Sequence, residues 1–342
     1  MDQMIRVVHY MRRPGAGAYS LERLFEDVRT HLPADIHVSI YISHFISLGL
    51  FRRLYDIVRA PFCQNDVNHI TGDVHFLTYL LDRHRTVLTI LDCVSLECLH
   101  GIKRRLVWLF WYWLPEKRCA AITVISEVMR QQVLRHLHCD PDKVCVIYCN
   151  VSDEFKPEPH RFNVSKPRVL HVGTTANKNL ERHAAALEGL ECKLVIIGQL
   201  SDTQVDVLKH HRVSYENYVD LSREALLKEY CCCDMVLFAS TYEGFGLPIV
   251  EANAVGRPVV TSNIWSMPEV AGDAACLVDP FSVDSIRDGI LRVIGDSAYR
   301  EHLVESGFEN VKRFHIETIA EQYASLYRTI HAQLSNHCEG KG

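Results

Sequence analysis

The chain has 342 residues, of which 48% are hydrophobic and 23% are charged, and its formal net charge is −5 at pH 7. This length suits two domains of ordinary size, and the proportions are typical of a folded globular protein rather than a disordered one. The slightly acidic balance argues against nucleic acid as a partner, because nucleic-acid-binding domains carry a basic surface.

Short apolar runs alternate with amphipathic helical patterns along the whole chain, and this predicts an α/β fold of parallel sheets with helices on both faces. A helix is expected from Ser126, which can cap the run "EVMRQQVLRHL" that follows it. In the first half, strands are expected near residues 5–10, 36–42, 66–70, 86–91, 121–125 and 143–148.

The segment 151–167 has three prolines and little apolar periodicity, so it is expected to link two domains. We place an N-terminal Rossmann-like domain at 1–158 and a second one at 159–315. Ligands of such sheets bind at the carboxyl ends of the strands, here in a cleft between the domains. In the second domain, strands are expected at 168–173, 192–198, 234–240 and 257–263, and helices near 179, at 222–232 and after Pro248.

The stretch "STYEGFGLPIVEA" at 240–252 has two glutamates on either side of an otherwise apolar, glycine-containing segment. Glu243 is expected in the loop that follows a buried strand. Pro248 suits the first turn of the next helix, and Glu251 then lies about one turn inside that helix.

The glycines of this stretch, Gly244 and Gly246, would let backbone amides and the positive helix end approach a phosphate. Carboxylates beside a phosphate site favour hydroxyl partners, which can donate hydrogen bonds to them. The combination indicates a nucleotide sugar as ligand. The alternative is that Glu243 caps the helix and Glu251 is a solvated helix residue without a ligand.

Three consecutive segments, "EGFGLPIVEA", "GRPVVTSN" and "MPEVAGDAACLVDP", resemble the C-terminal signature of GT-B retaining glycosyltransferases of the family 4 type. "HVGTTANKNL" at 171–180 resembles the lysine-containing segment of this family. "RFHIETIAEQYASLYRTI" resembles its closing helix, which implies that 316–342 crosses back to the N-terminal domain. The implied architecture is GT-B, with two Rossmann-like domains facing each other across a cleft.

The resemblance implies a role for each matching residue. Glu243 would contact hydroxyls of the donor sugar, Lys178 would neutralise the diphosphate as it departs, and Glu251 would hold the ribose. These implied roles make Glu243 and Lys178 the catalytic candidates. The backbone amides implied to serve the donor are those of Gly244, Phe245, Gly246 and Leu247.

The N-terminal domain is implied to contribute a glycine loop, here Gly15 and Gly17, although a simple tight turn would also explain these residues. The sequence departs from the family pattern at Asn177, where many relatives have an arginine beside or a few residues before the lysine. A second departure is Leu91, where relatives commonly have a histidine. We treat Asn177 and His69 as candidate polar contacts, with His75 as an alternative to His69.

Three readings of Leu91 stay open: another histidine supplies the contact, the donor lacks the corresponding hydroxyl, or the activity has been lost. The leading interpretation is a retaining, metal-independent glycosyltransferase without a cofactor, which moves a sugar from a nucleoside diphosphate donor to a glycan or lipid-linked saccharide. The alternatives are a noncatalytic relative that binds sugar nucleotides and a GT-B sugar-nucleotide epimerase. The single Asp-x-Asp, 140–142, is explained by a turn, so no metal site is expected.

The segment "GIKRRLVWLFWYWLPEKR" at 101–118 joins a basic cluster to tryptophans, as in helices that lie on anionic membranes. The alternative is a helix whose apolar face packs on the sheet. No signal-like segment or membrane-spanning run is apparent, and the cysteines lack zinc-site spacing. We therefore expect a cytoplasmic protein, with peripheral membrane contact through 101–118 as an open alternative.

Overall fold

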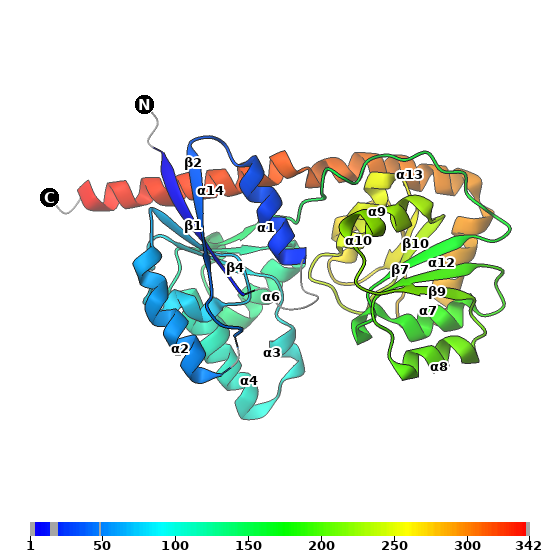
Figure 1. Ribbon diagram of the computed structural model, residues 1–342, viewed down its shortest axis with the longest axis horizontal. Coiled ribbons are helices and arrows are strands. Elements are labelled where there is room, and N and C mark those ends of the chain that lie inside the picture. Colours follow the sequence, from blue (N-terminus) through cyan, green and yellow to red (C-terminus); the bar gives the residue numbers. More distant parts are fainter. Residues whose placement is uncertain (1–3, 14–19, 48, 340–342) are drawn as a thin grey trace. The chain divides into compact units, whose positions relative to one another are not determined.

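The computed structural model describes residues 4–13, 20–47 and 49–339, and the chain divides into two compact units (Figure 1). The first unit comprises Met1–Asn150 and Ile316–Gly342, and the second comprises Val151–His315. Each unit is built on a six-stranded sheet in which all strand pairs are parallel. The predicted α/β class is confirmed.

The sheet of the first unit has the strand order β2-β1-β3-β4-β5-β6. Its inner strands are buried, as parallel sheets covered by helices require, whereas the edge strand β2 is largely exposed. The elements are β1 (Ile5–Met11), α1 (Ser20–His31), β2 (Ile36–Ile42), α2 (Leu50–Arg59), η1 (Ala60–Cys63), β3 (Val67–Ile70), η2 (His75–Leu80), β4 (Thr86–Ile90), α3 (Val94–Cys98), α4 (Gly101–Val107), η3 (Trp108–Trp113), α5 (Leu114–Lys117), β5 (Ala121–Val124), α6 (Glu127–Leu137), η4 (Pro141–Lys143) and β6 (Val144–Val146).

The long C-terminal helix α14 (Ile316–Glu339) belongs to the first unit and packs on α1, β1 and β3 (Figure 1). Tyr327 of this helix is fully buried, and its hydroxyl lies 3.0 Å from His9 Nε2 and 2.7 Å from His69 Nδ1. Arg328 adds a bidentate ion pair to Asp35 at the surface. The helix thus completes the core of the first unit.

The sheet of the second unit has the order β12-β11-β10-β7-β8-β9. Helix α7 packs with α8 and α12, whereas α10 packs with α9 and α13 (Figure 1). The elements are β7 (Arg168–Val172), η5 (Ala176–Lys178), α7 (Leu180–Leu187), β8 (Lys193–Ile197), α8 (Asp202–His210), β9 (Tyr215–Tyr218), α9 (Arg223–Cys232), β10 (Met235–Phe238), α10 (Leu247–Val255), β11 (Val259–Ser262), α11 (Met267–Ala271), β12 (Cys276–Val278), α12 (Val283–Gly295), α13 (Ser297–Val311) and η6 (Lys312–Phe314).

Two strands of this sheet, β9 and β12, were not among the expected ones. Both are edge strands, of four and three residues. β9 reads "YENY" and lacks the apolar run that indicates a buried strand, whereas β12 lies within the apolar run "AACLV" at 274–278, which was not assigned to a strand. The boundary between the units also differs from the one set at 158/159. Residues 151–158 lie in the second unit because Val151 N donates to Phe314 O and the Arg257 guanidinium donates to Glu158 O.

Candidate functional site

The predicted site residues of the second unit lie on two adjacent loops at the carboxyl edge of its sheet, except for Leu247 and Glu251, which lie on α10 directly after the second loop. One loop follows β7 and the other follows β10, and these strands are neighbours, with Val236 paired with Leu170. Parallel strands end at the same edge, so residues far apart in the sequence meet there. The loops are tied together by the backbone amide of Thr241, which donates to Asn177 O at 2.8 Å.

The first loop begins with Gly173, whose φ of +92° lies in the left-handed region that favours glycine. A Cβ atom at this position would lie 2.9 Å from Lys178 Cε and 3.0 Å from Lys178 Cγ. The absence of a side chain therefore lets Lys178 extend across the end of β7. Lys178 also lies over the ring of Phe238, with Nζ 4.6 Å from the ring centroid.

Lys178 and Glu243, the two predicted catalytic residues, form an ion pair. The distance from Lys178 Nζ to Glu243 Oε1 is 2.7 Å, and their side chains are only 18% and 13% exposed. Partial removal from water strengthens such a charge-assisted hydrogen bond. The edge of the sheet therefore carries a fixed cation beside a fixed carboxylate.

Asn177 supports this pair from the same loop. Its amide Nδ2 donates to Tyr242 O at 2.9 Å and lies 3.3 Å from Glu243 Oε1. The side chain therefore orients the glutamate and its loop. This is a positioning contact within the protein at the place where many relatives have an arginine.

The loop 243–247 is held from the other side by Ser266, a residue that the sequence did not single out. Its hydroxyl lies 2.9 Å from Glu243 O and 2.7 Å from Phe245 O and can donate to either. Next to it, the ring of Trp265 packs edge-on against Tyr242 at 4.7 Å. Ser266 is fully buried, and only its place beside "MPEVAG" in the sequence hinted at this role.

Gly246 is the N-cap of α10 and has a φ of +112°. A Cβ atom here would lie 3.1 Å from Ile249 Cδ1, so the turn into the helix is both left-handed and tight. Gly244 and Leu247 are partly exposed, whereas Phe245 is buried. The positive end of the α10 dipole therefore lies at the loop that carries Glu243.

Glu251 lies on α10 and is partly buried. The hydroxyl of Tyr230 donates to its Oε2 at 2.5 Å. Burial, together with the nearby Glu251 charge, raises the pKa of Tyr230 well above its ordinary value, so the phenol keeps its proton. Tyr230 thereby fixes one carboxylate oxygen of Glu251, a contact that no sequence motif reveals.

The candidates from the first domain have a different outcome. Gly15 and Gly17 lie outside the described residues. His69 is fully buried, and its ring nitrogens lie 2.7 Å from Tyr327 Oη and 2.7 Å from Thr89 Oγ1. Both nitrogens have protein partners in the core, so this position does not support a contact with a ligand.

The other histidine considered in the sequence, His75, is also buried, and its Nδ1 lies 2.7 Å from Trp111 O. Leu91 directly follows β4 and is half-buried. His69 therefore does not substitute for the polar group that is missing at Leu91, whereas a role for His75 stays a prediction.

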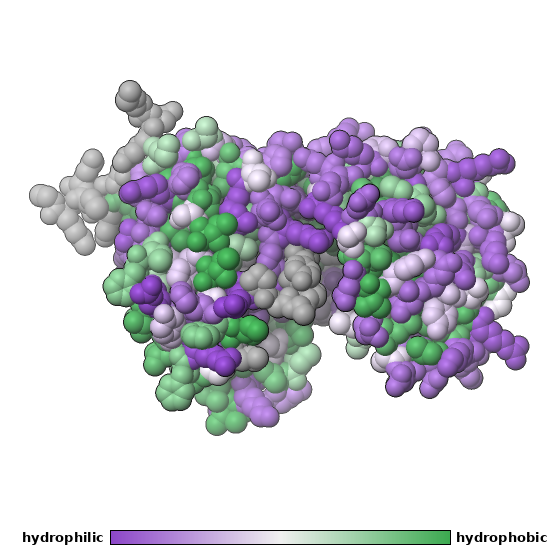
Figure 2. Space-filling view, viewed as in Figure 1, coloured by the Kyte–Doolittle hydropathy of each residue, from purple (hydrophilic) through white to green (hydrophobic). Residues whose placement is uncertain are grey.

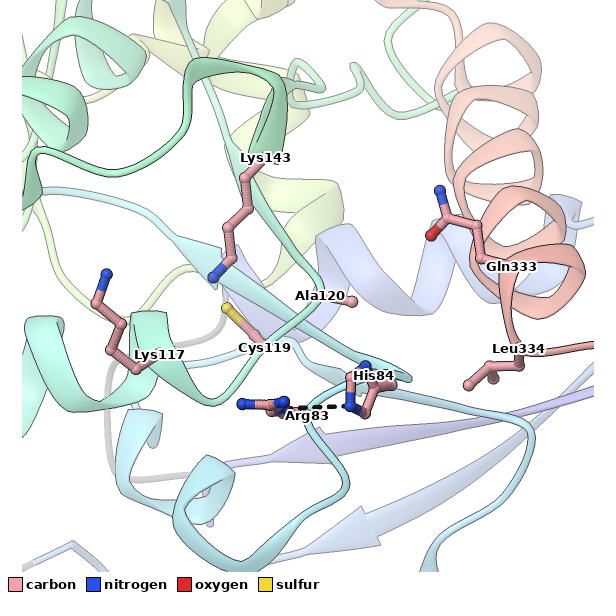
Figure 3. A pocket seen from close by; sticks show the side chains of 8 residues that line it. All are labelled: Arg83, His84, Lys117, Cys119, Ala120, Lys143, Gln333 and Leu334. Carbon is pink, nitrogen blue, oxygen red and sulfur yellow. Dashed lines mark hydrogen bonds between the residues drawn. The ribbon is translucent and has the colours of Figure 1, made fainter. Parts of the chain in front are cut away.

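Two pockets of the described residues lie away from these loops. Figure 3 shows the first, a cavity of about 370 Å³ near the amino ends of β4, β5 and β6, lined by Arg83, His84, Lys117 and Lys143 among others. Both lysines form ion pairs with the buried Glu116. The second, of about 710 Å³, lies near the amino ends of β10 and β11. Neither pocket contains a predicted site residue. Both lie at the amino edge of a sheet, whereas ligands of parallel sheets bind at the carboxyl edge.

A family model described as "Glycosyl transferases group 1" matches residues 152–310. This segment holds both glutamates, Lys178 and all the supporting contacts described above for the second unit. It covers nearly the whole of the second unit, whose bounds are Val151–His315.

The chain is similar to O-antigen chain mannosyltransferase B of Escherichia coli, with 41% identity over 232 residues. That match covers 61% of this chain and 60% of the relative, so the chain spans about three fifths of the length of this relative.

No helix within the described ranges has the length and apolar character needed to cross a membrane.

Among solved structures, sucrose-phosphate synthase from Thermosynechococcus elongatus superimposes with a TM-score of 0.78 at 16% identity. It covers 96% of this chain and 100% of the other. The Anabaena protein HepE in complex with UDP-glucose superimposes with a TM-score of 0.74 at 16% identity, over 95% of this chain and 100% of the other. At these identities the likeness shows the fold alone, and that fold is the GT-B architecture.

Proposed function

Because residues 152–310 match the family model of the glycosyl transferases group 1, we propose that the protein transfers a sugar from a nucleoside diphosphate donor to a hydroxyl group of a glycan. The observation that carries the proposal is the 2.7 Å contact between Lys178 and Glu243. It pairs a group that suits departing phosphates with a group that suits sugar hydroxyls, at the edge of the sheet where ligands bind.

Lys178 would stabilise the diphosphate leaving group. Negative charge grows on the phosphate oxygens as the glycosidic bond breaks, and a cation that is already in place lowers the barrier without further reorganisation. The ion pair with Glu243 and the contact with Phe238 hold the ammonium in one position. This pre-organisation supports a catalytic role over that of a solvated surface lysine.

Glu243 would accept hydrogen bonds from hydroxyls of the donor sugar. Within the described residues, the hydrogen bonds from Lys178 and Asn177 both end on its Oε1. Oε2 therefore has acceptor capacity for a ligand hydroxyl. The N-terminal end of α10, which follows directly in the chain, would face the diphosphate.

Glu251 would hold the ribose of the nucleotide. The hydroxyl of Tyr230 donates to Oε2 of the Glu251 carboxylate, and a carboxylate can accept several hydrogen bonds at once. The tyrosine fixes the carboxylate, so two ribose hydroxyls can bind it without an entropic cost for orienting the glutamate.

We further propose a retaining and metal-independent reaction of the family 4 type, in which the departing phosphate takes the proton of the acceptor hydroxyl on the same face. Lys178 supplies the positive charge that a metal ion supplies in other glycosyltransferases. The likeness to O-antigen chain mannosyltransferase B supports a mannosyl donor and a growing polysaccharide chain as acceptor.

A thermal-shift screen against UDP-, GDP-, ADP- and TDP-sugars, followed by transfer assays with each stabilising donor, tests the proposal. A donor at 100 times its Kd should stabilise the protein by about 2.7 kcal/mol. Transfer should disappear in Glu243→Gln and persist in Glu305→Gln, which changes an exposed glutamate of α13.

Binding without transfer or donor hydrolysis would instead identify a noncatalytic sugar-nucleotide-binding protein, the alternative that Leu91 favours. Release of a changed nucleotide sugar without an acceptor would identify an epimerase. A failure of all four donors to stabilise the protein would overturn the proposal.

A further inference from the structure

Helix α2 of the first unit exposes an apolar face. Positions 50, 54 and 58, and also 51 and 55, are spaced by four residues and therefore lie on one side of the helix. All five side chains face solvent, with exposed fractions of 77% for Leu50, 85% for Phe51, 52% for Leu54, 43% for Tyr55 and 49% for Val58.

The side of α2 that packs on the unit is polar instead. Asp56 is 2% exposed, and its Oδ1 accepts a hydrogen bond from the backbone of His44 at 2.9 Å. Arg53 donates to Ser47 O at 2.8 Å. An amphipathic surface helix normally buries its apolar side. In α2 the orientation is reversed, so its apolar side is not needed for the core.

The apolar face continues onto neighbouring elements. Phe45 packs edge-on against Tyr55 of α2, with the ring centroids 5.5 Å apart. On the packed side of α2, the guanidinium carbon of Arg53 lies 4.9 Å from the ring centroid of Trp111, so η3 is a neighbour of α2. Every residue of 101–106 in α4, the helix that leads into η3, is exposed. The further exposed apolar side chains of this region are Phe45, Ile46, Phe62, Ile102, Leu106 and Phe110. We call residues 45–47 and 49–62 together with 101–110 the α2–α4 surface. Figure 2 shows apolar side chains gathered at the lower left, where Figure 1 places α2 and α4.

The charges on the α2–α4 surface are almost all positive. The single acidic residue, Asp56, is buried, so it does not offset the positive charge at the surface. Such a surface complements negative charge. The basic residues are Arg52, Arg53, Arg59, Lys103, Arg104 and Arg105.

We propose that the α2–α4 surface binds an anionic lipid bilayer. Leucine and phenylalanine side chains would enter the boundary between headgroups and acyl chains, while the neighbouring arginines would meet lipid phosphates. Long basic side chains can place their charge in the headgroup layer while their stems cover apolar surface. The combination of a large apolar area and a basic cluster supplies the two signals that stable binding to a membrane needs.

This assignment differs from the one that the sequence suggested. The open alternative from the sequence was a membrane contact through the tryptophan-rich face of 101–118, but Trp108 Nε1 donates to His136 O at 2.9 Å and Trp111 Nε1 donates to Asp73 Oδ1 at 3.0 Å. These rings are half-buried against the first unit. The membrane-facing side chains are instead those of α2 and the exposed part of α4.

Co-sedimentation of the full chain with vesicles tests the proposal without any sugar donor, so its result does not depend on the proposed enzymatic activity. Vesicles of phosphatidylcholine alone are compared with vesicles that contain phosphatidylglycerol as well. Binding should be at least about tenfold tighter to the anionic vesicles and should weaken as salt is added.

Two sets of variants locate the binding surface. The double substitution Phe51→Ser/Phe62→Ser should weaken vesicle binding by on the order of tenfold or more. The triple substitution Arg52→Gln/Lys103→Gln/Arg105→Gln should weaken it by on the order of 100-fold, at about one kcal/mol for each basic residue. The matched controls lie in the second unit and should bind as the unchanged chain does: Phe281→Ser, and Lys156→Gln/Lys166→Gln/Lys209→Gln.

Three results would overturn the proposal: no sedimentation with anionic vesicles, equal binding to both vesicle types, or unchanged binding by the two α2–α4 variants. A dimer that Phe51→Ser/Phe62→Ser dissociates, with no vesicle binding, would instead make this surface an interface between two copies. Melting temperatures show whether each variant is folded, and all changed side chains are at the surface, so losses of binding can be separated from losses of structure.

Discussion

Lys178 and Glu243 are 65 positions apart in the sequence, yet Lys178 Nζ lies 2.7 Å from Glu243 Oε1. The contact exists because β7 and β10 are neighbours in the sheet and the loops after them share one edge. It joins the cation proposed for the diphosphate to the carboxylate proposed for the sugar. Four predictions concern this site and the two cores.

Replacing Lys178 by alanine should lower kcat by about 100- to 1000-fold, as expected for the loss of a group that stabilises transition-state charge. It should also leave Glu243 without its cation, at a cost of about 1–3 kcal/mol in stability. Steady-state kinetics and urea unfolding measure the two effects. Lys209→Ala, on exposed α8, is the control, and a kcat for Lys178→Ala within a factor of three of the unchanged enzyme would contradict the role.

Gly173→Ala should lower activity through the position of Lys178. The new Cβ would lie 2.9 Å from Lys178 Cε, and the flexible lysine would give way before the backbone does. The matched control is Gly189→Ala, which has a similar left-handed φ of +72° but no atom within 4 Å of the new Cβ. Both variants should lose about 1 kcal/mol or more of stability.

Only Gly173→Ala should also lose transfer activity. Equal activity losses in the two glycine variants, measured under conditions where both are folded, would show that backbone strain rather than the displacement of Lys178 is responsible.

Tyr230→Phe should weaken nucleotide binding while it leaves turnover nearly unchanged. The ring stays buried, but Glu251 loses the hydrogen bond that orients it. A loss of about 1.4 kcal/mol in binding would raise the donor KM roughly tenfold. Calorimetry measures the binding of the intact nucleotide sugar and of the donor without its sugar, and both should bind more weakly to Tyr230→Phe. Tyr299→Phe serves as the control, because this ring in the first turn of α13 packs on Arg292 of α12. A fall in kcat with unchanged KM would contradict the assignment.

Stability should fall as the pH drops below about 6.5. Burial lowers the pKa of His69 from 6.5 to about 3 and that of His171 to about 4. The folded state therefore keeps these rings neutral at pH values where the unfolded chain binds protons. The unfolded state binds more protons between these values, so stability rises with pH in that window and is lost as pH falls through it.

Urea unfolding at pH 7 and at pH 5 measures this dependence. His69→Gln should be less stable than the unchanged protein at pH 7 but should lose less stability on acidification. Exposed His210→Gln should keep the original dependence on pH. An unchanged slope in His69→Gln would show that other groups cause the loss in acid.

The sequence alone determined the α/β class and the positions of most strands, because buried parallel strands are continuous apolar runs between helical patterns. It also placed Glu243 in a loop and Glu251 inside the following helix, since Pro248 and Gly246 mark the helix start. The positions of strands and helix starts depend mainly on residues that are close together in the sequence. The short edge strand β9 lacked such a run and was missed, and β12 was missed although it lies in the short apolar run "AACLV".

Contacts across the sheet were decided by the tertiary structure. The sequence could not indicate that Ser266 and Tyr230 hold the two glutamate-bearing segments, since each contact depends on the order of strands and on helix packing. The same holds for His69, whose ring nitrogens are satisfied within the core by residues 20 and 258 positions away.

Helix α2 shows most clearly which properties the sequence determines and which depend on the tertiary structure. Its sequence carries an apolar stripe, which a sequence-based reading assigns to the core. The structure turns that stripe to solvent because Arg53 and Asp56 on the other side have polar partners in the first unit. Periodicity reveals that a helix has two faces, but only the partners available in three dimensions decide which face is buried.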